Sequence, residues 1–389
     1  MQDTRKTIML LCGGFSFYNR RKICYNKIQS NPNRSLIRNK IKRVIYMNER
    51  DFFNKISDMN GKAFIVGGFV RDLQLGLAPH DKDYVVEGVY EERFKQAFPA
   101  VEKTGKDFPV FRVLIDDVPC EVAFARKEKK IGVGTNGFSM VTENVTIEND
   151  LYRRDLTINA IAMTESGDIV DPFGGVHDIN NKVIKHVSDH FVEDPLRVYR
   201  VARFCAKFSD FTVAESTKNL LSSMKEEIKF LTQERVELET EKILTTQKPS
   251  KAFELLAECG LLDVHFGNKN NFDLLKRVEQ QTNDTTLRFV ALMLDVKGDA
   301  NNFKIRAWKQ ALHNAQKLLN QPNTMLEKLL WLDKVDRLGL GQEAFLLFDH
   351  DQENLALWNR VKSVKGEEFA KGKDFPVELA QKRAKILLP

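Results

Sequence analysis

Cysteine is scarce in this 389-residue chain, and no two cysteines form a CxxC pair. This scarcity excludes a disulfide framework and a structural zinc site, and it predicts buried or inert thiols in a reducing compartment. No run of eighteen or more apolar residues occurs, so we expect no membrane span. Hydrophobic residues make up 42% and charged residues 29%, as in an ordinary soluble protein with a sizeable core. The five cysteines are Cys12, Cys24, Cys120, Cys205 and Cys259.

Acidic residues are almost missing from residues 1–46, where Asp3 stands against eleven Lys and Arg, a net charge of +10. The whole chain carries +6, which leaves −4 for residues 47–389. The net charge of the whole chain therefore does not indicate nucleic-acid binding. A site for a polyanion in residues 47–389 must be a local basic patch. The leader's composition suits an organellar transit peptide, while a true start at Met47 and a basic RNA-binding arm are the alternatives.

The hydrophobic pattern predicts a mixed α/β head and a helical remainder. Residues 47–59 form an amphipathic helix, and residues 62–76 read as a strand, a Gly-Gly turn and a helix ended by Gly76. A second strand covers 82–88, and 110–126 forms a hairpin around Asp116 and Asp117. From residue 150 the pattern is helical, apart from a strand and turn over 168–175, and it stays helical from about 190 to the end.

Two acids, Asp81 and Asp83, flank Lys82 in the second predicted strand. Side chains alternate along a strand, so both carboxylates should project from one face. Carboxylates this close repel each other unless a cation lies between them, and hard oxygen ligands suit Mg²⁺. Glu121, on the neighbouring strand, is a candidate third carboxylate or an exposed strand acid. An isolated D-x-D is usually a solvated strand, so the metal interpretation depends on the residues around it.

Adjacent glycines, Gly67 and Gly68, end the strand that precedes these acids. Without a Cβ they let backbone N–H groups approach an anion, and the start of the following helix adds favourable charge. Arg71, one turn into that helix, can reach the same anion. A phosphate cradle just before a metal-binding strand predicts a nucleoside triphosphate site, in which two metal ions can clamp the attacking and leaving oxygens.

Four ordered motifs over about residues 62–265 resemble the nucleotidyltransferase superfamily and, more narrowly, the class II CCA-adding tRNA nucleotidyltransferases. The resemblance implies an α+β fold, with a small mixed β-sheet nucleotidyltransferase head followed by an all-α neck, body and tail. The stretch 234–244, "ERVELETEKIL", is similar to the part that closes the neck. The motifs are "GGFVRDLQLG" with "DKD", "RRDLTINAIA" (153–162), "DPFGGVHDI" (171–179) and "EDPLRVYRVARF" (193–204).

The second motif offers groups for phosphate and sugar. Arg153 and Arg154 can neutralise phosphates, and Asp155 can accept a hydrogen bond from a ribose hydroxyl. Asn159, one turn later, can brace the loop. The resemblance implies triphosphate contact by Arg154 and ribose recognition by Asp155.

The fourth motif predicts the choice of base. Asp194 and Arg197 are three residues apart, which makes them neighbours on a helix. An acceptor beside a donor fork matches the Watson–Crick edges of cytosine and adenine and repels those of uracil and guanine. The resemblance implies a protein template that selects CTP and ATP, with Arg200 and Arg203 as further nucleotide contacts. Arg203 would lie nearly opposite Asp194 on the helix.

Two places bear on the kind of enzyme. The stretch 126–139 matches a flexible loop that relatives need to add the final A, or it is an ordinary mobile hairpin. Some relatives carry an HD phosphohydrolase domain, but here Asp295 follows Leu294 rather than a histidine. We therefore expect that domain to be degenerate or absent. The expected parts are the leader 1–46, the head 47–185, the neck 186–266 with the nucleotide-selecting motif, and the body and tail 267–389.

The predicted function is template-independent addition of CCA to the 3′ end of tRNA from CTP and ATP, by two-metal nucleotidyl transfer with Mg²⁺. A poly(A) polymerase is the alternative enzyme, although "FPVFRVLIDD" (108–117) does not match the Arg-rich stretch of that group. An inactive RNA-binding homologue and an NTP-binding regulatory module are alternatives of other classes. We expect a cytoplasmic protein, or an organellar one if residues 1–46 are a transit peptide, and the sequence does not indicate the oligomeric state.

Overall fold

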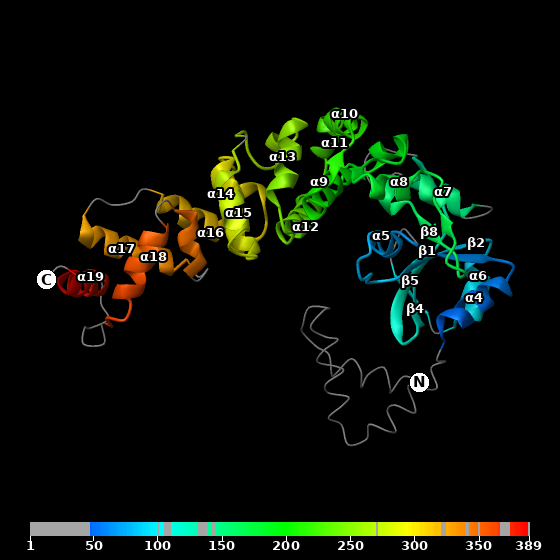
Figure 1. The fold of residues 1–389 in the computed structure, drawn as a ribbon, viewed down its shortest axis with the longest axis horizontal. Helices are drawn as coiled ribbons and strands as arrows, with labels where there is room; N and C mark the ends of the chain where they lie inside the picture. The colour runs from blue at the N-terminus through cyan, green and yellow to red at the C-terminus, as the bar shows by residue number, and fades with distance from the viewer. Residues whose placement is uncertain are drawn as a thin grey trace, which may run out of the picture.

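The structure is a computed structural model that describes residues 47–99, 101–104, 110–130, 138–141, 145–269, 271–319, 324–338, 342–348, 351–365 and 374–387. The expectations for the leader 1–46 and for the centre of the glycine-rich loop, 131–137, lie outside these residues. A sheet-containing head stands at one end, and helices follow one another away from it (Figure 1). Within the described ranges, no helix has the length and apolar character needed to cross a membrane.

The head is built on a seven-stranded mixed sheet in the order β3-β4-β5-β2-β1-β8-β9. Only β2 and β5 pair in parallel, and the other neighbours are antiparallel. The parallel register places Asp83 opposite Glu121. The strands are β1 (Lys62–Val66), β2 (Asp83–Glu87), β3 (Glu102–Thr104), β4 (Val110–Ile115), β5 (Val118–Phe124), β8 (Ala162–Met163) and β9 (Ile169–Val170), and β6 (Lys127–Lys130) and β7 (Phe138–Val141) form a separate hairpin.

Local sequence signals explain the turns of the sheet. The predicted hairpin is confirmed, because β4 and β5 meet at Asp116 (φ 49°) and Asp117 (φ 61°). Two left-handed residues in a two-residue turn match the twist of antiparallel strands, and Asp tolerates this conformation. The strand–turn–helix is also confirmed, with Gly67 (φ 71°) between β1 and α5 (Gly68–Gln74), and Gly76 (φ 69°) after the helix.

Alternation along the strands gives the sheet two apolar faces. Tyr84 and Val86 face an aromatic cluster under α4 (Glu49–Ser57) and α6 (Glu91–Ala97), where the Phe52 and Tyr84 ring centroids are 5.0 Å apart. Val85 faces the opposite cluster, which includes residues of α7 (Ile147–Tyr152). Because Asp83 is two residues before Val85, its side chain belongs to the α7 side of the sheet.

The segment from residue 150 is less helical than predicted. The α7 helix ends at Tyr152, a 3₁₀ turn η1 covers Thr157–Asn159, and the chain then enters β8. The physical reason lies in Asp155, whose carboxylate accepts from the Leu156 amide at 2.8 Å and from Asn159 Nδ2 at 3.1 Å. A short polar side chain that binds nearby donors in this way favours a turn over a helix.

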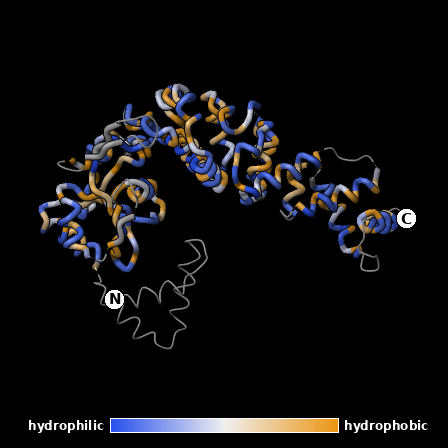
Figure 2. Tube along the Cα trace, turned by 180° about the vertical axis from the view of Figure 1, so that it is seen from behind, coloured by the Kyte–Doolittle hydropathy of each residue, from blue (hydrophilic) through white to orange (hydrophobic). Residues whose placement is uncertain are grey.

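The remainder is helical, as the α+β prediction requires, with a small interruption where β10 (Val183–Ile184) pairs with β11 (Thr212–Val213). Hydrophobic and hydrophilic residues mix along these helices (Figure 2), and α9 packs against α12 and α13. The helices are α8 (Gly175–Asn180), η2 (Asp189–Glu193), α9 (Arg197–Lys207), α10 (Glu215–Ser223), α11 (Lys225–Ile228), α12 (Gln233–Leu244), α13 (Ser250–Glu258), η3 (Leu262–Val264), α14 (Asp273–Glu279), α15 (Thr285–Asp295), η4 (Ala300–Asn302), α16 (Arg306–Lys317), α17 (Met325–Asp336), η5 (Gln342–Leu347), α18 (Asp351–Val361) and α19 (Phe375–Leu387).

Candidate active site

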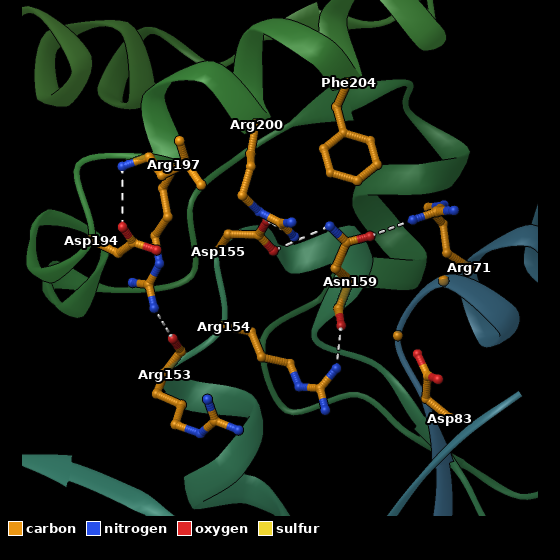
Figure 3. A pocket seen from close by; sticks show the side chains of 13 residues that line it. Arg71, Asp83, Arg153, Arg154, Asp155, Asn159, Asp194, Arg197, Arg200 and Phe204 are labelled. Carbon is orange, nitrogen blue, oxygen red and sulfur yellow. Dashed lines mark hydrogen bonds and ion pairs between the residues drawn. The ribbon is translucent and has the colours of Figure 1, made fainter. Parts of the chain in front are cut away.

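A pocket of about 530 Å³ lies where the head meets the first long helix of the remainder. A volume of this size lies within the range of sites for small ligands. Four pieces of chain supply its walls: the β1–α5 turn, the start of β2, the segment after α7, and the start of α9 (Figure 3). The lining residues are Gly67, Gly68, Arg71, Asp83, Arg153, Arg154, Asp155, Asn159, Asp194, Leu196, Arg197, Arg200 and Phe204.

The acidic side of the pocket is centred on Asp83. The pKa of Asp83 is raised to about 6, mainly because the surrounding protein partly removes its carboxylate from water. Charge repulsion from Glu121 and Asp81 also raises this pKa, whereas Arg154 acts to lower it. The prediction that Asp81 and Asp83 share one strand is wrong in detail, because β2 begins at Asp83. Lys82 does point to the opposite side, where its Nζ is 2.8 Å from Glu49 Oε1.

These carboxylates fit a divalent metal ion in charge and in donor type. Desolvation and the negative charges of Glu121 and Asp81 both raise the pKa of Asp83, and a bound cation would offset them. Carboxylate oxygens are the ligands that hard cations prefer. Over the described ranges, no three His, Cys, Asp or Glu side chains are grouped closely enough to hold a metal.

The glycine turn borders the basic side. At Gly67 (φ 71°, ψ −127°), an added Cβ would lie 3.1 Å from Arg154 Nη1. At Gly68, an added Cβ would lie 3.5 Å from Arg71 Nη2. Both predicted phosphate-binding arginines therefore lie directly against the bare backbone of the turn.

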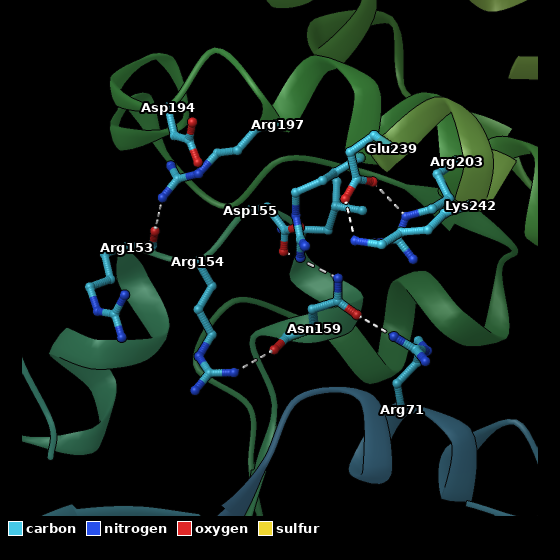
Figure 4. Close-up of polar contacts among 12 residues, drawn as sticks. Arg71, Arg153, Arg154, Asp155, Asn159, Asp194, Arg197, Arg203, Glu239 and Lys242 are labelled. Carbon is cyan, nitrogen blue, oxygen red and sulfur yellow. Dashed lines mark hydrogen bonds and ion pairs between the residues drawn. The ribbon is translucent and has the colours of Figure 1, made fainter. Parts of the chain in front are cut away.

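Arg71 is buried and held on two sides. Its Nη1 donates to Asn159 Oδ1 at 2.6 Å, and its Nε and Nη2 donate to Asp72 Oδ1 at 2.8 and 2.7 Å. The guanidinium carbon also lies 5.3 Å from the centre of the Phe204 ring on α9. Asn159 therefore holds Arg71 through its Oδ1 and holds Asp155, beside the η1 turn, through its Nδ2 (Figure 4).

Asp155 connects this turn to α9. The Arg200 guanidinium reaches Asp155 Oδ2, with Nε at 2.7 Å and Nη2 at 2.6 Å. Burial alone would raise the pKa of Asp155, but Arg200 and hydrogen bonds from Asn159 and the Leu156 amide lower it below the usual value. Each carboxylate oxygen therefore already accepts from a donor of this chain.

Asp194 and Arg197 line the same pocket, but their arrangement differs from the prediction. Asp194 is extended (φ −119°, ψ 102°) and precedes α9, which begins at Arg197. Asp194 Oδ1 accepts from the Leu196 amide and from Arg235 Nη2, both at 3.2 Å. Arg197 donates to two backbone carbonyls, those of His190 and Arg153. The two side chains share a wall of the pocket, and each has partners elsewhere in the chain.

Three predicted residues lie outside the lining. Arg203 turns toward α12, where its Nε donates to Glu239 Oε2 at 2.9 Å (Figure 4). Glu121 is exposed on β5 next to Asp83, and Asp81 is exposed before β2. Of these, the two acids act on the pocket through their charge on Asp83.

Sequence reasoning missed Asp150, which is completely buried on α7. Its Oδ1 accepts from Arg153 Nη2 at 2.5 Å, and its Oδ2 accepts from Arg154 Nη2 at 3.0 Å. The available signal was the spacing, because Asp150 stands three and four residues before the two arginines, where helical neighbours meet. Burial alone would raise the pKa of Asp150, but the two arginines hold it below the usual value.

The other residues considered from the sequence have structural contacts. Asp295 accepts from the amides of Leu274 and Leu275, at 3.2 and 2.8 Å, and so caps the start of α14. Cys120, Cys205 and Cys259 are free and buried, as predicted. Cys12 and Cys24 belong to the leader, outside the described residues.

Comparisons with known proteins agree with this geometry. Residues 63–185 match the family described as "Poly A polymerase head domain", and residues 210–268 match "Probable RNA and SrmB- binding site of polymerase A". The "Multifunctional CCA protein" of Shewanella denitrificans is 44% identical over 260 residues, which cover 60% of this chain and 62% of the relative.

Residues 63–185 and 210–268 are therefore similar to two domains of poly(A) polymerases, and 60% of the chain is similar to a CCA protein. A second relative, the "Multifunctional CCA protein" of Pseudoalteromonas atlantica, is 47% identical over 211 residues, 53% of this chain and 51% of the relative. The chain thus spans about half to three-fifths of the length of these relatives. Its fold matches a Thermotoga maritima CCA-adding enzyme complexed with tRNA at a TM-score of 0.62 and 24% identity, over 86% of this chain and 90% of the other. Nucleotidyltransferases of the CCA-adding kind use a divalent metal ion.

Proposed function

We propose that this chain adds C, C and A to the 3′ end of tRNA from CTP and ATP, without a nucleic-acid template. The observation that carries the proposal is that one pocket combines Asp83, the glycine turn with Arg71 and Arg154, and the Asp194–Arg197 wall. A metal-binding acid, a triphosphate cradle and a base-facing wall are together what nucleotide selection and transfer require.

The acidic side of the pocket serves the reacting groups. Asp83 and Asp81 would hold Mg²⁺, with Glu121 beside Asp83 on the next strand. When bound, Mg²⁺ activates the terminal tRNA hydroxyl and stabilises the departing pyrophosphate. That hydroxyl attacks the α-phosphate of CTP or ATP, so one phosphodiester bond forms as the bond to pyrophosphate breaks.

The basic side binds the nucleotide. The backbone at Gly67 and Gly68, with Arg71 and Arg154, would hold the triphosphate through charge-assisted hydrogen bonds. Asp194 and Arg197 would read the Watson–Crick edge, since a carboxylate only accepts and a guanidinium only donates.

Asp155 and its partners support this side. Asp155 would serve the ribose and also fixes Arg200 and Asn159. Arg200 lines the pocket and is the second nucleotide contact on α9, whereas Arg203 lies with Glu239 and would act on the nucleotide only indirectly.

The remaining parts of the chain would hold the tRNA. We propose a head over 47–185, a neck over 186–266 and a helical body and tail over 267–389, with phosphate contacts along the helices. The family relatives named for CCA addition or solved with tRNA support this assignment. That the relatives are bacterial CCA proteins also supports our proposal of a cytoplasmic protein.

A poly(A) polymerase is the second candidate, because both matched family descriptions refer to that enzyme. One experiment separates the two. Purified protein is incubated with Mg²⁺, tRNA that lacks its CCA end, and CTP, ATP, UTP or GTP singly and together. CCA addition predicts three residues and then a stop with CTP plus ATP, whereas a poly(A) polymerase extends without limit on ATP alone.

The Asp83→Ala variant is the control for the site. Incorporation should disappear in this variant while the protein remains folded by circular dichroism. No incorporation by the wild-type protein would favour an inactive RNA-binding homologue, and undiminished incorporation by the variant would refute the metal assignment.

A further inference from the structure

Asp150 is a buried carboxylate whose two oxygens serve two different arginines. Arg153 contacts Oδ1 through Nε at 3.0 Å and Nη2 at 2.5 Å, and Arg154 contacts Oδ2 through Nε at 3.3 Å and Nη2 at 3.0 Å. The same edge of each guanidinium, Nε with Nη2, is used for this contact. Such bidentate contacts fix the plane and direction of an arginine side chain.

The contact with Asp150 leaves the other end of Arg154 aimed at the pocket. Arg154 Nη1 lies against the Gly67 turn, 3.1 Å from where a Cβ would be, and makes a long hydrogen bond of 3.4 Å to the Asn159 carbonyl. Arg154 also lowers the pKa of Asp83, which places its charge within reach of the acidic side. The guanidinium therefore spans the distance from a buried anion to the position proposed for the triphosphate.

Asp150 carries one negative charge and contacts two cations that line the pocket, Arg153 and Arg154. Arg153 and Arg154 are each partly exposed there, at 16% and 19% of their side chains, while Asp150 is at 0%. An anion that enters the pocket would meet guanidinium groups that Asp150 already orients.

We propose that Asp150 is a positioning residue that aims Arg154 at the triphosphate. This inference rests on the proposed function, because it assumes that a nucleoside triphosphate occupies the pocket. Asp150 itself touches no substrate. Asp150 acts on nucleotide binding through Arg154. Its loss should therefore weaken binding of the phosphates and leave binding of the base unchanged.

The test compares CTP with CMP in Asp150→Asn, which keeps the size of the side chain. Asn has one acceptor oxygen, and its amide would face the N–H groups of one arginine, so Arg154 loses its anchor. We expect CTP affinity, measured by calorimetry with Mg²⁺, to fall about tenfold or more, the effect of one lost charge-assisted hydrogen bond. CMP affinity should change less than about twofold, because CMP lacks the phosphates that Arg154 reaches.

Two comparisons separate positioning from general damage. Asp295→Asn removes a partly buried carboxylate that caps a distant helix, and it should leave both affinities unchanged. Adding Asp150→Asn to Arg154→Ala should weaken CTP binding no more than Arg154→Ala alone, since the two residues act as a unit.

The outcomes distinguish this inference from the proposed function. Equal losses for CTP and CMP in Asp150→Asn, or additive losses in the double variant, would overturn the positioning role and leave the proposed function standing. A wild-type protein that binds neither CTP nor ATP would overturn both. A loss confined to CTP, and absent on the Arg154→Ala background, would support the inference.

Discussion

Nη2 of Arg197 donates to the backbone carbonyl of Arg153 at 2.6 Å, which joins the start of α9 to the turn after α7. Asp150 contacts the side chain of Arg153 and Arg197 contacts its carbonyl, so a single residue lies between the phosphate side and the base side of the pocket. The link to Arg197 runs through the backbone of Arg153, whereas the link to Asp150 runs through its side chain. Nucleotide selection should therefore depend on backbone contacts as well as on the reading side chains.

Arg197→Lys should weaken the choice between CTP and UTP. Lysine lacks the planar fork that reaches two carbonyls and presents parallel donors to a base. We expect the ratio of kcat/KM for CTP over UTP to fall about tenfold to a hundredfold, the value of one bidentate contact. Arg277→Lys is the matched control, because Arg277 also binds a backbone carbonyl, that of Leu346, but outside the pocket. An unchanged ratio in Arg197→Lys would refute its role in base selection.

The raised pKa of Asp83 predicts an unusual dependence of stability on pH in the absence of metal. With a folded pKa of about 6 against an ordinary 3.8, the native state binds more protons between these values. The contribution of Asp83 to stability should therefore be fully present below about pH 4 and be lost as pH rises through about 6. The melting temperature of the wild type in EDTA, taken relative to that of Asp83→Asn at the same pH, should decrease over this range.

Magnesium should reverse that loss. Above about pH 6 the ionised Asp83 can accept a cation, so Mg²⁺ should raise the melting temperature of the wild type more than that of Asp83→Asn. Equal responses of the two proteins to Mg²⁺ would argue against metal binding at Asp83. The same titration repeated at about pH 5 should give a weaker response, because protons compete for the carboxylate.

Gly67→Ala tests the cradle against a matched glycine. Both Gly67 and Gly76 have positive φ, at 71° and 69°, so alanine strains the backbone at either place. Only at Gly67 would the new Cβ press on Arg154 Nη1, whereas nothing lies within 4 Å at Gly76. Both variants should lose about 1 kcal/mol or more of unfolding free energy. Only Gly67→Ala should also lose CTP affinity, and an equal loss in Gly76→Ala would contradict the cradle.

Arg288 should be essential for the helical remainder. It is 1% exposed and donates to five oxygens at 2.6–3.1 Å. They belong to Leu244, Thr246, Glu279, Thr282 and Asn283. Arg288→Ala leaves several carbonyls without partners and should cost at least about 3 kcal/mol in urea unfolding. The exposed Arg306→Ala should change stability by less than about 0.5 kcal/mol, and similar effects in both variants would refute the anchor.

The head could be predicted from sequence wherever the signals are local. The Gly67–Gly68 turn and the Asp116–Asp117 hairpin need only a backbone preference and flanking apolar runs, and both are confirmed. The sequence predicted that Glu121 lies on a strand next to Asp83, but it did not predict which residues pair. Parallel strands are joined by a long connection, and local patterns do not specify their register.

The base-facing wall was harder to predict. Three-residue spacing made Asp194 and Arg197 helical neighbours only if the helix included Asp194. Pro195 follows directly, and the residue before a proline is pushed toward extended backbone, so α9 starts later. The carbonyl partners of Arg197 come from His190 and Arg153, which no spacing rule connects to it.

The residues that line the pocket are far apart in sequence, since the first is Gly67 and the last is Phe204. This separation has a consequence for biosynthesis. As the polypeptide leaves the ribosome, the sheet strands up to β5 become available well before α9 does. Contacts of large sequence separation form slowly, because a long loop must close before any of them is gained. The nucleotide site should therefore be among the last parts to mature, and a nascent chain released before residue 204 would carry a sheet without a working pocket.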